Sequence, residues 1–216
     1  MKRRDFSLAC GAAMAGAALV QSPAMAQGKP PEAGTDYLML EKRAVVEAPA
    51  DKIEIVEFFW YSCPHCNAFE PTFDAWRKRV PKDFAVRRVP AAFQDSFVPQ
   101  QRLFYALEAM GLVDQLHGKV FAAIHVEKQD LSRGDAIADW VAKQGVDKAK
   151  FLTQYNSFSV ATKASRGTQL QNAYKVEGVP ALGVAGRFYT DGSLAKSMDR
   201  ALKVVEFLAA GIRSGR

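Results

Sequence analysis

Two cysteines separated by two residues, placed just after a strongly apolar run, restrict the folds open to this chain more than any other feature. Residues 53–60 read Ile-Glu-Ile-Val-Glu-Phe-Phe-Trp, rich in β-branched and aromatic residues as buried strands are. After Cys63, aromatic residues recur at the spacing of one helix face: Phe69, Phe73 and Trp76. The sequence therefore predicts a buried strand that leads into a helix opened by Cys63 and ended by Pro81.

The predicted helix start explains how the two thiols would differ. At the N-cap, Cys63 meets unpaired backbone N–H groups and the positive end of the helix dipole, which favour a thiolate. Pro64 suits the first helical position, where its missing N–H is not needed. Cys66 would lie beneath Cys63, and the short loop that a disulfide would close indicates redox chemistry rather than a structural bond. We therefore predict that Cys63 is the exposed, attacking thiol and Cys66 the resolving one.

His65 lies between the two cysteines and is predicted to tune them. An imidazolium beside the Cys63 thiolate would lower its pKa and make the disulfide a stronger oxidant; the alternative is a solvated loop histidine. The pair could also be half of a zinc site, but zinc needs four ligands, and we expect His117 and His125 at the surface or in packing. With no metal, nucleotide or flavin motif in the chain, we predict no cofactor and no metal.

The first 26 residues have the pattern of a cleaved export signal. Lys2-Arg3-Arg4 is followed by a short apolar run and by the cleavage pattern Ala24-Met25-Ala26. The segment Arg3–Leu8 also resembles a twin-arginine signal. Cys10 lies within this segment and could belong to a lipid-attachment site. We favour the alternative, in which Cys10 is a small apolar residue of the discarded peptide. We therefore predict a signal peptide over 1–26 and a periplasmic location.

Charge excludes one class of partner. Cleavage would leave 190 residues and lower the net charge from +6 to +4. The basic residues are spread along the chain without the basic stripe of a nucleic-acid-binding protein, so we expect no nucleic acid partner.

No later apolar stretch reaches the roughly 20 residues that a membrane-spanning helix needs, so we expect a soluble mature protein.

The remaining pattern predicts an α/β sheet interrupted by a helical bundle. An edge strand within 37–46 and strands over 84–89, 181–185 and 187–190 join the run at 53–60. Helices are predicted over 97–110, 112–126, 134–144, 147–155, 158–174 and 197–213. Ser132 and Asp135 form a capping-box pattern. Arg87 and Arg88 are expected at a solvated strand end with charge partners.

The strand–Cys-Pro-His-Cys–helix block, together with the later segment Tyr174–Ala181, resembles the DsbA family of periplasmic thiol:disulfide interchange proteins. The resemblance extends from about residue 40 to 213. It implies a thioredoxin fold interrupted by an inserted helical domain. The thioredoxin-like domain would comprise residues 37–93 and 169–216, and the insert residues 94–168.

The resemblance also implies further site residues. Val179 and Pro180 would form the cis-proline loop that packs against the disulfide and pairs with substrate backbone. Glu57 would be the buried carboxylate that transfers a proton to or from Cys66, unless it lies on a solvated face. Glu70 would correspond to a second acid near the site. The chain departs from the family's usual pattern at Gly183, which is expected to loosen the groove wall, and at Trp60-Tyr61-Ser62.

These features predict an oxidase that donates its Cys63–Cys66 disulfide to unfolded or folding exported proteins with free cysteines. The family implies re-oxidation by a DsbB-like membrane quinone reductase, and we expect a monomer. There are two alternatives. One is a reductase or isomerase on the same fold, and the other is a peptide-binding chaperone with an incidental disulfide. Because the Cys63 thiolate would be stabilised in the folded protein, we expect the reduced form to be more stable than the oxidised form.

Overall fold

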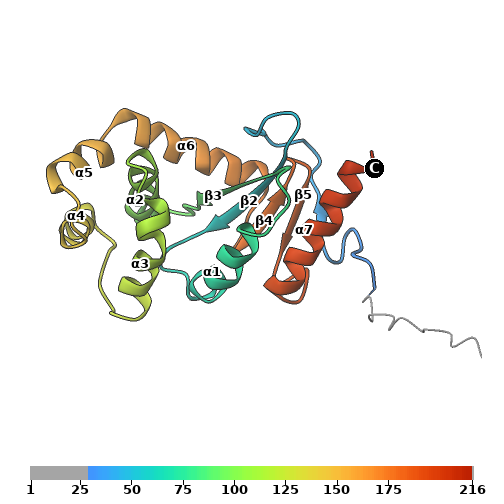
Figure 1. Cartoon of the computed structure of the whole chain (residues 1–216), viewed down its shortest axis with the longest axis horizontal. Coiled ribbons are helices and arrows are strands. Elements are labelled where there is room, and N and C mark those ends of the chain that lie inside the picture. The colour runs from blue at the N-terminus through green and yellow to red at the C-terminus, as the bar shows by residue number, and fades with distance from the viewer. Residues whose placement is uncertain (1–28, 216) are drawn as a thin grey trace, which may run out of the picture. The chain divides into compact units, whose positions relative to one another are not determined.

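The structure is a computed structural model that describes residues 29–215, and residues 31–216 form one compact unit. The predicted signal peptide and Cys10 lie outside the described residues. Figure 1 shows the elements in chain order, which are β1 Leu38–Met39, β2 Ile53–Phe59, α1 Pro64–Arg77, β3 Phe84–Pro90, the 3₁₀ turn η1 Asp95–Phe97, α2 Val98–Ala109, α3 Val113–His125, α4 Gly134–Lys143, α5 Lys148–Tyr155, α6 Phe158–Ala173, β4 Ala181–Val184, β5 Phe188–Asp191 and α7 Met198–Arg213.

The five strands form one mixed sheet in the order β1-β5-β4-β2-β3. β2 and β3 are parallel, as a crossover through α1 requires. β4 pairs antiparallel with β2, β5 with β4, and β1 with β5. β2 therefore lies inside the sheet, and all seven of its residues are buried, as the apolar run predicted.

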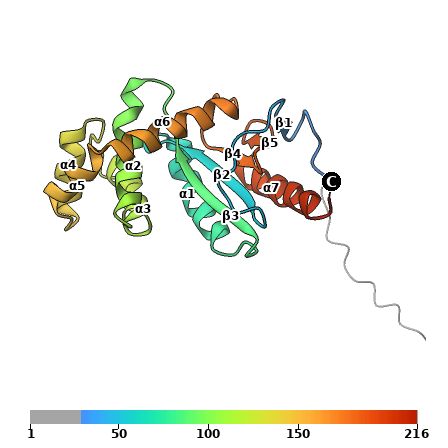
Figure 2. The same cartoon turned by 90° about the horizontal axis from the view of Figure 1, so that it is seen from above.

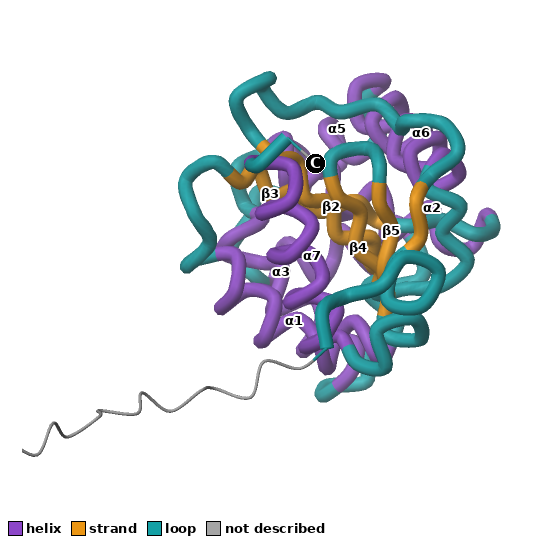
Figure 3. Tube along the Cα trace, turned by 90° about the vertical axis from the view of Figure 1, so that its right-hand side faces the viewer, coloured by secondary structure: helices purple, strands orange, loops and turns teal. Residues whose placement is uncertain are grey.

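Helices cover both faces of the sheet, and alternate residues of β2 point to opposite faces. Ile53 and Ile55 pack in one apolar cluster with residues of α1 and α7. Val56 and Phe58 pack in another, with Leu170 of α6 and residues that follow it. Figure 3 shows α1 and α7 on one side of the strands and α6 on the other. This layering places the start of α1 at the carboxyl end of β2.

Helices α2 to α5 gather at one end of the sheet (Figure 2), and α6 leads the chain back along it. The apolar core of this bundle includes Phe59, Tyr61 and both cysteines, so the thiols lie where the bundle meets the sheet. The helix α6 runs without a break through residue 168, where the sequence predicts the end of the insert. The division into 37–93 with 169–216, and 94–168, stays a prediction.

Most predicted elements form, with local differences. Helix α1 ends at Arg77, four residues before Pro81. The capping box at Ser132 and Asp135 is wrong: Arg133 caps α4 without a side-chain bond, because Asp135 pairs with the Arg133 guanidinium and the Ser132 amide donates to Asp130. Over residues 29–215, no helix has the length and apolar character to cross a membrane.

Candidate active site

Cys63 caps the first turn of α1, as the sequence predicts. Its backbone is extended (φ −79°, ψ 119°), and Pro64 begins the helix. The Cys66 amide donates to Cys63 Sγ over 3.4 Å, and the two cysteines are not bonded to each other in this structure. One unpaired N–H group of the helix start is thereby directed at the sulfur. Cys63 is placed for thiolate chemistry by the local fold alone.

The two thiols lie in environments that separate their acidities. A hydrogen bond from the Cys66 side chain lowers the pKa of Cys63 to about 6, aided by backbone N–H groups and the charge of exposed His65. Burial raises the pKa of Cys66 far above its ordinary value, since a thiolate there would be desolvated. Cys63 is the better leaving group and nucleophile, and Cys66 is the thiol that holds its proton.

The loop before β4 lies against Cys63. The Val179–Pro180 peptide bond is cis, the geometry that the family resemblance implies. Cys63 Sγ donates to the carbonyl oxygen of Val179 over 3.3 Å. Because this loop and the bundle surround the thiol, Cys63 is only 7% exposed and Cys66 1%. The expectation that Cys63 is exposed is therefore wrong. Cys63 is nevertheless the more accessible of the two thiols.

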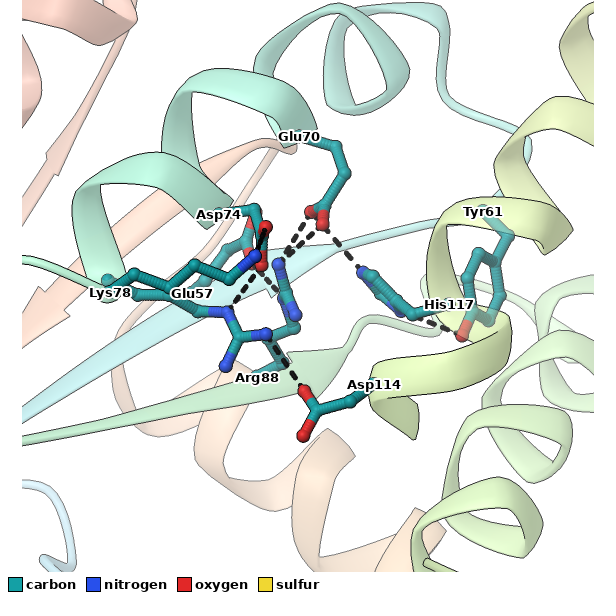
Figure 4. Close-up of polar contacts among 9 residues, drawn as sticks. Glu57, Tyr61, Glu70, Asp74, Lys78, Arg88, Asp114 and His117 are labelled. Atoms are coloured by element: carbon teal, nitrogen blue, oxygen red, sulfur yellow. Dashed lines mark hydrogen bonds and ion pairs between the residues drawn. The ribbon is translucent and has the colours of Figure 1, made fainter. Parts of the chain in front are cut away.

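Glu57 is buried in β2, and its carboxylate shares a cation with Glu70 (Figure 4). Arg88 Nε donates to Glu57 over 3.0 Å, and Arg88 Nη2 donates to both oxygens of Glu70 over 2.6 and 2.8 Å. Burial raises the pKa of Glu57 to about 8, against the opposing effect of Arg88. The buried interpretation of Glu57 is therefore the right one, and the carboxyl group holds a proton at neutral pH.

The prediction of a solvated Arg87–Arg88 pair is wrong for Arg88, which is 9% exposed. The parallel register places Arg88 directly opposite Glu57, on the face that α1 covers. Arg87 points to the other face and keeps charge partners, Glu47 and Glu54. Strand register depends on pairing across the chain, so the local sequence contains no signal for it.

His117 of α3 joins this cluster from the helical bundle, and sequence reasoning did not find it as a site residue. It is 3% exposed, with Nε2 3.3 Å from Glu70 Oε2 and Nδ1 2.9 Å from the Tyr61 hydroxyl. Burial lowers the pKa of His117. His125 is the last residue of α3, and its Nε2 bonds to the Tyr61 carbonyl oxygen over 2.8 Å. His117 is buried and His125 is half-buried, and only the docking of α3 reveals which groups they contact.

The three residues before Cys63, where the sequence departs from the family pattern, all contact the bundle. Trp60 stacks on Phe97 with ring centroids 3.9 Å apart. Tyr61 bonds to His117, and the Ser62 hydroxyl accepts from Gln100 over 2.7 Å. This segment therefore ties the thiols to the helical bundle.

Gly183 in β4 does not loosen a groove wall, contrary to expectation. The Tyr174 ring occupies the space where a side chain would lie: a Cβ on Gly183 would be 2.4 Å from the ring. Tyr174 is buried, and its hydroxyl accepts from the Gly186 amide over 2.9 Å. Within residues 29–215, no group of three or more His, Cys, Asp or Glu side chains is arranged to hold a metal ion.

A thiol pair at the first turn of a helix, beside a cis-proline loop at the end of a β2-β4 ladder, defines a thiol:disulfide oxidoreductase of the thioredoxin fold. The DSBA-like thioredoxin domain family matches residues 87–203. The chain belongs to the DsbA family, and it is a thiol:disulfide oxidoreductase of the kind that acts in oxidative protein folding.

Relatives of known name agree with this assignment. A thiol:disulfide interchange protein DsbA of Burkholderia cepacia is 40% identical over 191 residues, covering 88% of this chain and 90% of the relative. The DsbA of Pseudomonas aeruginosa PAO1 is 40% identical over 176 residues, covering 82% and 83%. The crystal structure of Pseudomonas aeruginosa DsbA superposes with a TM-score of 0.82 at 39% identity, covering 86% of this chain and 96% of that one. The predicted thioredoxin-type fold is confirmed.

Proposed function

We propose that this protein oxidises cysteine pairs in exported proteins by passing them the Cys63–Cys66 disulfide. The observation that carries the proposal is the different placement of the two thiols: Cys63 caps the start of α1 and accepts from the Cys66 amide, whereas Cys66 is buried. This placement lowers the pKa of Cys63 to about 6 and raises that of Cys66. A stabilised Cys63 thiolate favours the reduced enzyme, and therefore favours transfer of the disulfide to the substrate.

The exchange takes two steps. A substrate thiolate attacks Cys63 Sγ, a new intermolecular S–S bond forms, the Cys63–Cys66 bond breaks, and its electron pair stays on Cys66. A second substrate thiolate then attacks the substrate sulfur of the mixed disulfide, and Cys63 leaves as a thiolate. The substrate loses two electrons and the enzyme gains two. Cys63 Sγ is therefore the attacked atom in the first step and the leaving group in the second.

Glu57 is the proposed proton donor to the Cys66 thiolate released in the first step. Its carboxyl group is buried, protonated at neutral pH and near enough to Cys66 for its charge to raise the Cys66 pKa, which suits an acid that must act out of reach of water. When the enzyme is re-oxidised, the same carboxylate takes the proton back.

Pro64, His65, Val179 and Pro180 complete the proposed site. Pro64 starts the helix that presents Cys63, and the charge of His65 helps to lower the Cys63 pKa. The Val179 carbonyl lies against the thiol, so the loop is placed to contact both the disulfide and the backbone of a bound substrate.

The location and partners extend the same proposal. Residues 1–26 support export to the periplasm. Substrates would be unfolded or folding proteins with free cysteines, and a DsbB-like membrane quinone reductase would restore the disulfide. We propose a monomer with a thioredoxin-like domain of residues 37–93 and 169–216 and a helical insert of residues 94–168.

Oxidation of reduced, unfolded ribonuclease A by stoichiometric oxidised protein tests the proposal. We expect loss of ribonuclease thiols with matching appearance of enzyme thiols, and none with Cys63→Ser. Scrambled ribonuclease distinguishes an isomerase, which would restore activity without net electron transfer. A Cys63→Ser variant that still assists ribonuclease folding would instead favour the chaperone.

A further inference from the structure

The acid cluster beneath the thiols contains one cation for two carboxylates. Arg88 contacts both Glu57 and Glu70. With Glu57 protonated, Glu70 ionised, Arg88 charged and His117 neutral, the net charge of the cluster is zero. When Glu57 gives its proton to Cys66, an unbalanced negative charge is left among groups that are almost inaccessible to solvent. Such a buried charge is costly unless another group compensates for it.

His117 is placed to supply that compensation. Its Nε2 lies 3.3 Å from Glu70 Oε2 and has no aligned hydrogen-bond partner among the described residues. The other ring nitrogen is held by the Tyr61 hydroxyl (Figure 4). A proton on Nε2 would turn the contact with Glu70 into an ion pair.

His117 borders a cleft through which solvent protons can approach the cluster without passing the thiols. A cleft of about 770 Å³ between α1 and α3 is lined by Glu70, His117 and Arg88, together with charged residues at its mouth such as Asp74, Arg77 and Asp114. Glu57 does not line the cleft. Solvent protons can therefore reach His117, whereas Glu57 lies behind Arg88.

We propose that His117 takes up a proton from the cleft when Glu57 gives its proton to Cys66, so that the buried cluster keeps zero net charge during disulfide exchange. This inference rests on the proposed exchange at Cys63. The Cys66 thiolate gains the Glu57 proton, Glu57 then pairs with Arg88, and the His117 imidazolium pairs with Glu70. One proton enters from solvent, and re-oxidation returns it. His117 is thus a positioning residue that acts through Glu70 and Arg88.

The neighbours of His117 are consistent with a neutral imidazole before exchange and a charged one after it. The charged and titratable groups that face it are Glu70 and Arg77 of α1, Arg88 of β3 and Tyr61 before α1. Asp114 of its own helix lines the same cleft. Burial and the two guanidinium groups lower the pKa of His117, while Glu70 raises it. Ionisation of Glu57 adds a second negative charge to this set, which shifts the balance toward the imidazolium.

The test is rapid reduction of the oxidised protein by glutathione, with quenched-flow alkylation to count thiols and a pH-indicator dye to count protons. Two glutathione thiols release about two protons as they become a disulfide at pH 7, and the reduced wild type takes up one of them through His117. We therefore expect a net release of about one proton per reduced protein in the wild type and about two in His117→Gln. Because proton transfer contributes about 10²–10⁴-fold to such steps, we expect His117→Gln to slow reduction by about 10-fold at pH 7. In the wild type, we expect the reduction rate divided by the glutathione thiolate concentration to fall as the pH rises from 5 to 7, because His117 becomes harder to protonate. This fall should be absent in His117→Gln.

Two comparisons separate this role from a structural one. His125→Gln, on the same helix and also bonded to the Tyr61 segment, should keep wild-type proton uptake. In a Glu70→Gln background, where Arg88 has one carboxylate partner, His117→Gln should add no further loss. His117→Asn repeats the test if the Gln variant does not fold.

Equal rates and pH profiles for the wild type and His117→Gln would overturn the role of His117 alone, as would an additive loss in the Glu70→Gln background. If the oxidised wild type does not exchange with glutathione at all, the proposed function fails instead.

Discussion

At the scale of single residues, two chemically identical thiols three positions apart at the start of α1 acquire opposite properties. Cys63 accepts hydrogen bonds at the helix start, and its pKa falls to about 6. Cys66 lies one turn deeper in an apolar cluster, and its pKa rises. The difference follows from where the first helical turn ends and the core begins, because hydrogen bonds stabilise a thiolate and desolvation destabilises it.

This asymmetry predicts the behaviour of Cys66→Ser. The variant should accumulate mixed disulfides with client proteins through Cys63, because the thiol that would displace a bound client is gone. Non-reducing gels of periplasmic extracts, with and without added dithiothreitol, measure the adducts. The Cys63→Ser variant is the control and should form none. Adducts that form through Cys66 instead would reverse the assignment of the two thiols.

At the scale of secondary-structure elements, the site depends on register and close approach between strands and helices. The pairing of β2 with β3 sets Arg88 opposite Glu57. On the other face, β4 comes so near the end of α6 that the Tyr174 ring fills the space above Gly183. Only glycine fits at that point of the strand, because any Cβ would overlap the ring.

Gly183→Ala is therefore expected to destabilise the protein by about 1–3 kcal/mol, the usual cost of overpacking a core. The added Cβ, 2.4 Å from the Tyr174 ring, would displace the ring and weaken its bond to the Gly186 amide. Urea unfolding measures the change. The control is Gly211→Ala in α7, where a Cβ meets nothing within 4 Å and should not destabilise. Equal unfolding midpoints for Gly183→Ala and the wild type would contradict the packing argument.

At the scale of the whole molecule, the redox state of the site is linked to folding stability. The pKa of Cys63 is lowered from its ordinary 9.0 to about 6, so the thiolate stabilises the folded, reduced protein above pH 9 in full and loses this effect as the pH falls through about 6. At pH 7, only the interval of about one unit above the Cys63 pKa contributes, so the thiolate stabilises the folded reduced protein by about 1 kcal/mol. The chain-entropy model gives a disulfide over so short a loop about 2 kcal/mol. These two contributions nearly offset each other, and the expectation that the reduced form is more stable stays a prediction.

The measurable consequence is a pH dependence that only the reduced form shows. Between pH 5 and 7, the free energy of unfolding of the reduced protein should rise by about 1 kcal/mol relative to that of the oxidised protein. Denaturant unfolding of both forms at the two pH values tests this. The reduced Cys63→Ala variant should lose the extra slope. A difference between redox forms that is independent of pH would show that the Cys63 thiolate does not stabilise the folded state.

The sequence by itself determined the local chemistry of this protein. The apolar run of β2, the N-cap at Cys63, Pro64 in the first turn and the buried face of Phe69, Phe73 and Trp76 all form as predicted. Each depends on interactions within a few residues, which periodicity and capping patterns report directly. The family resemblance added the Val179–Pro180 loop, which lies too far along the chain for any local pattern to connect it with Cys63.

Only the tertiary structure decided what surrounds the thiols. Arg88 was expected in solvent, His117 at the surface or in packing without a role, and Gly183 at a loosened wall. Instead, strand register buries Arg88 between two carboxylates, the docking of α3 brings His117 to Glu70, and the approach of Tyr174 fills the space at Gly183. These contacts join residues on different secondary-structure elements, and their free energies depend on the register and packing of whole elements. Local sequence patterns contain no information on such distances.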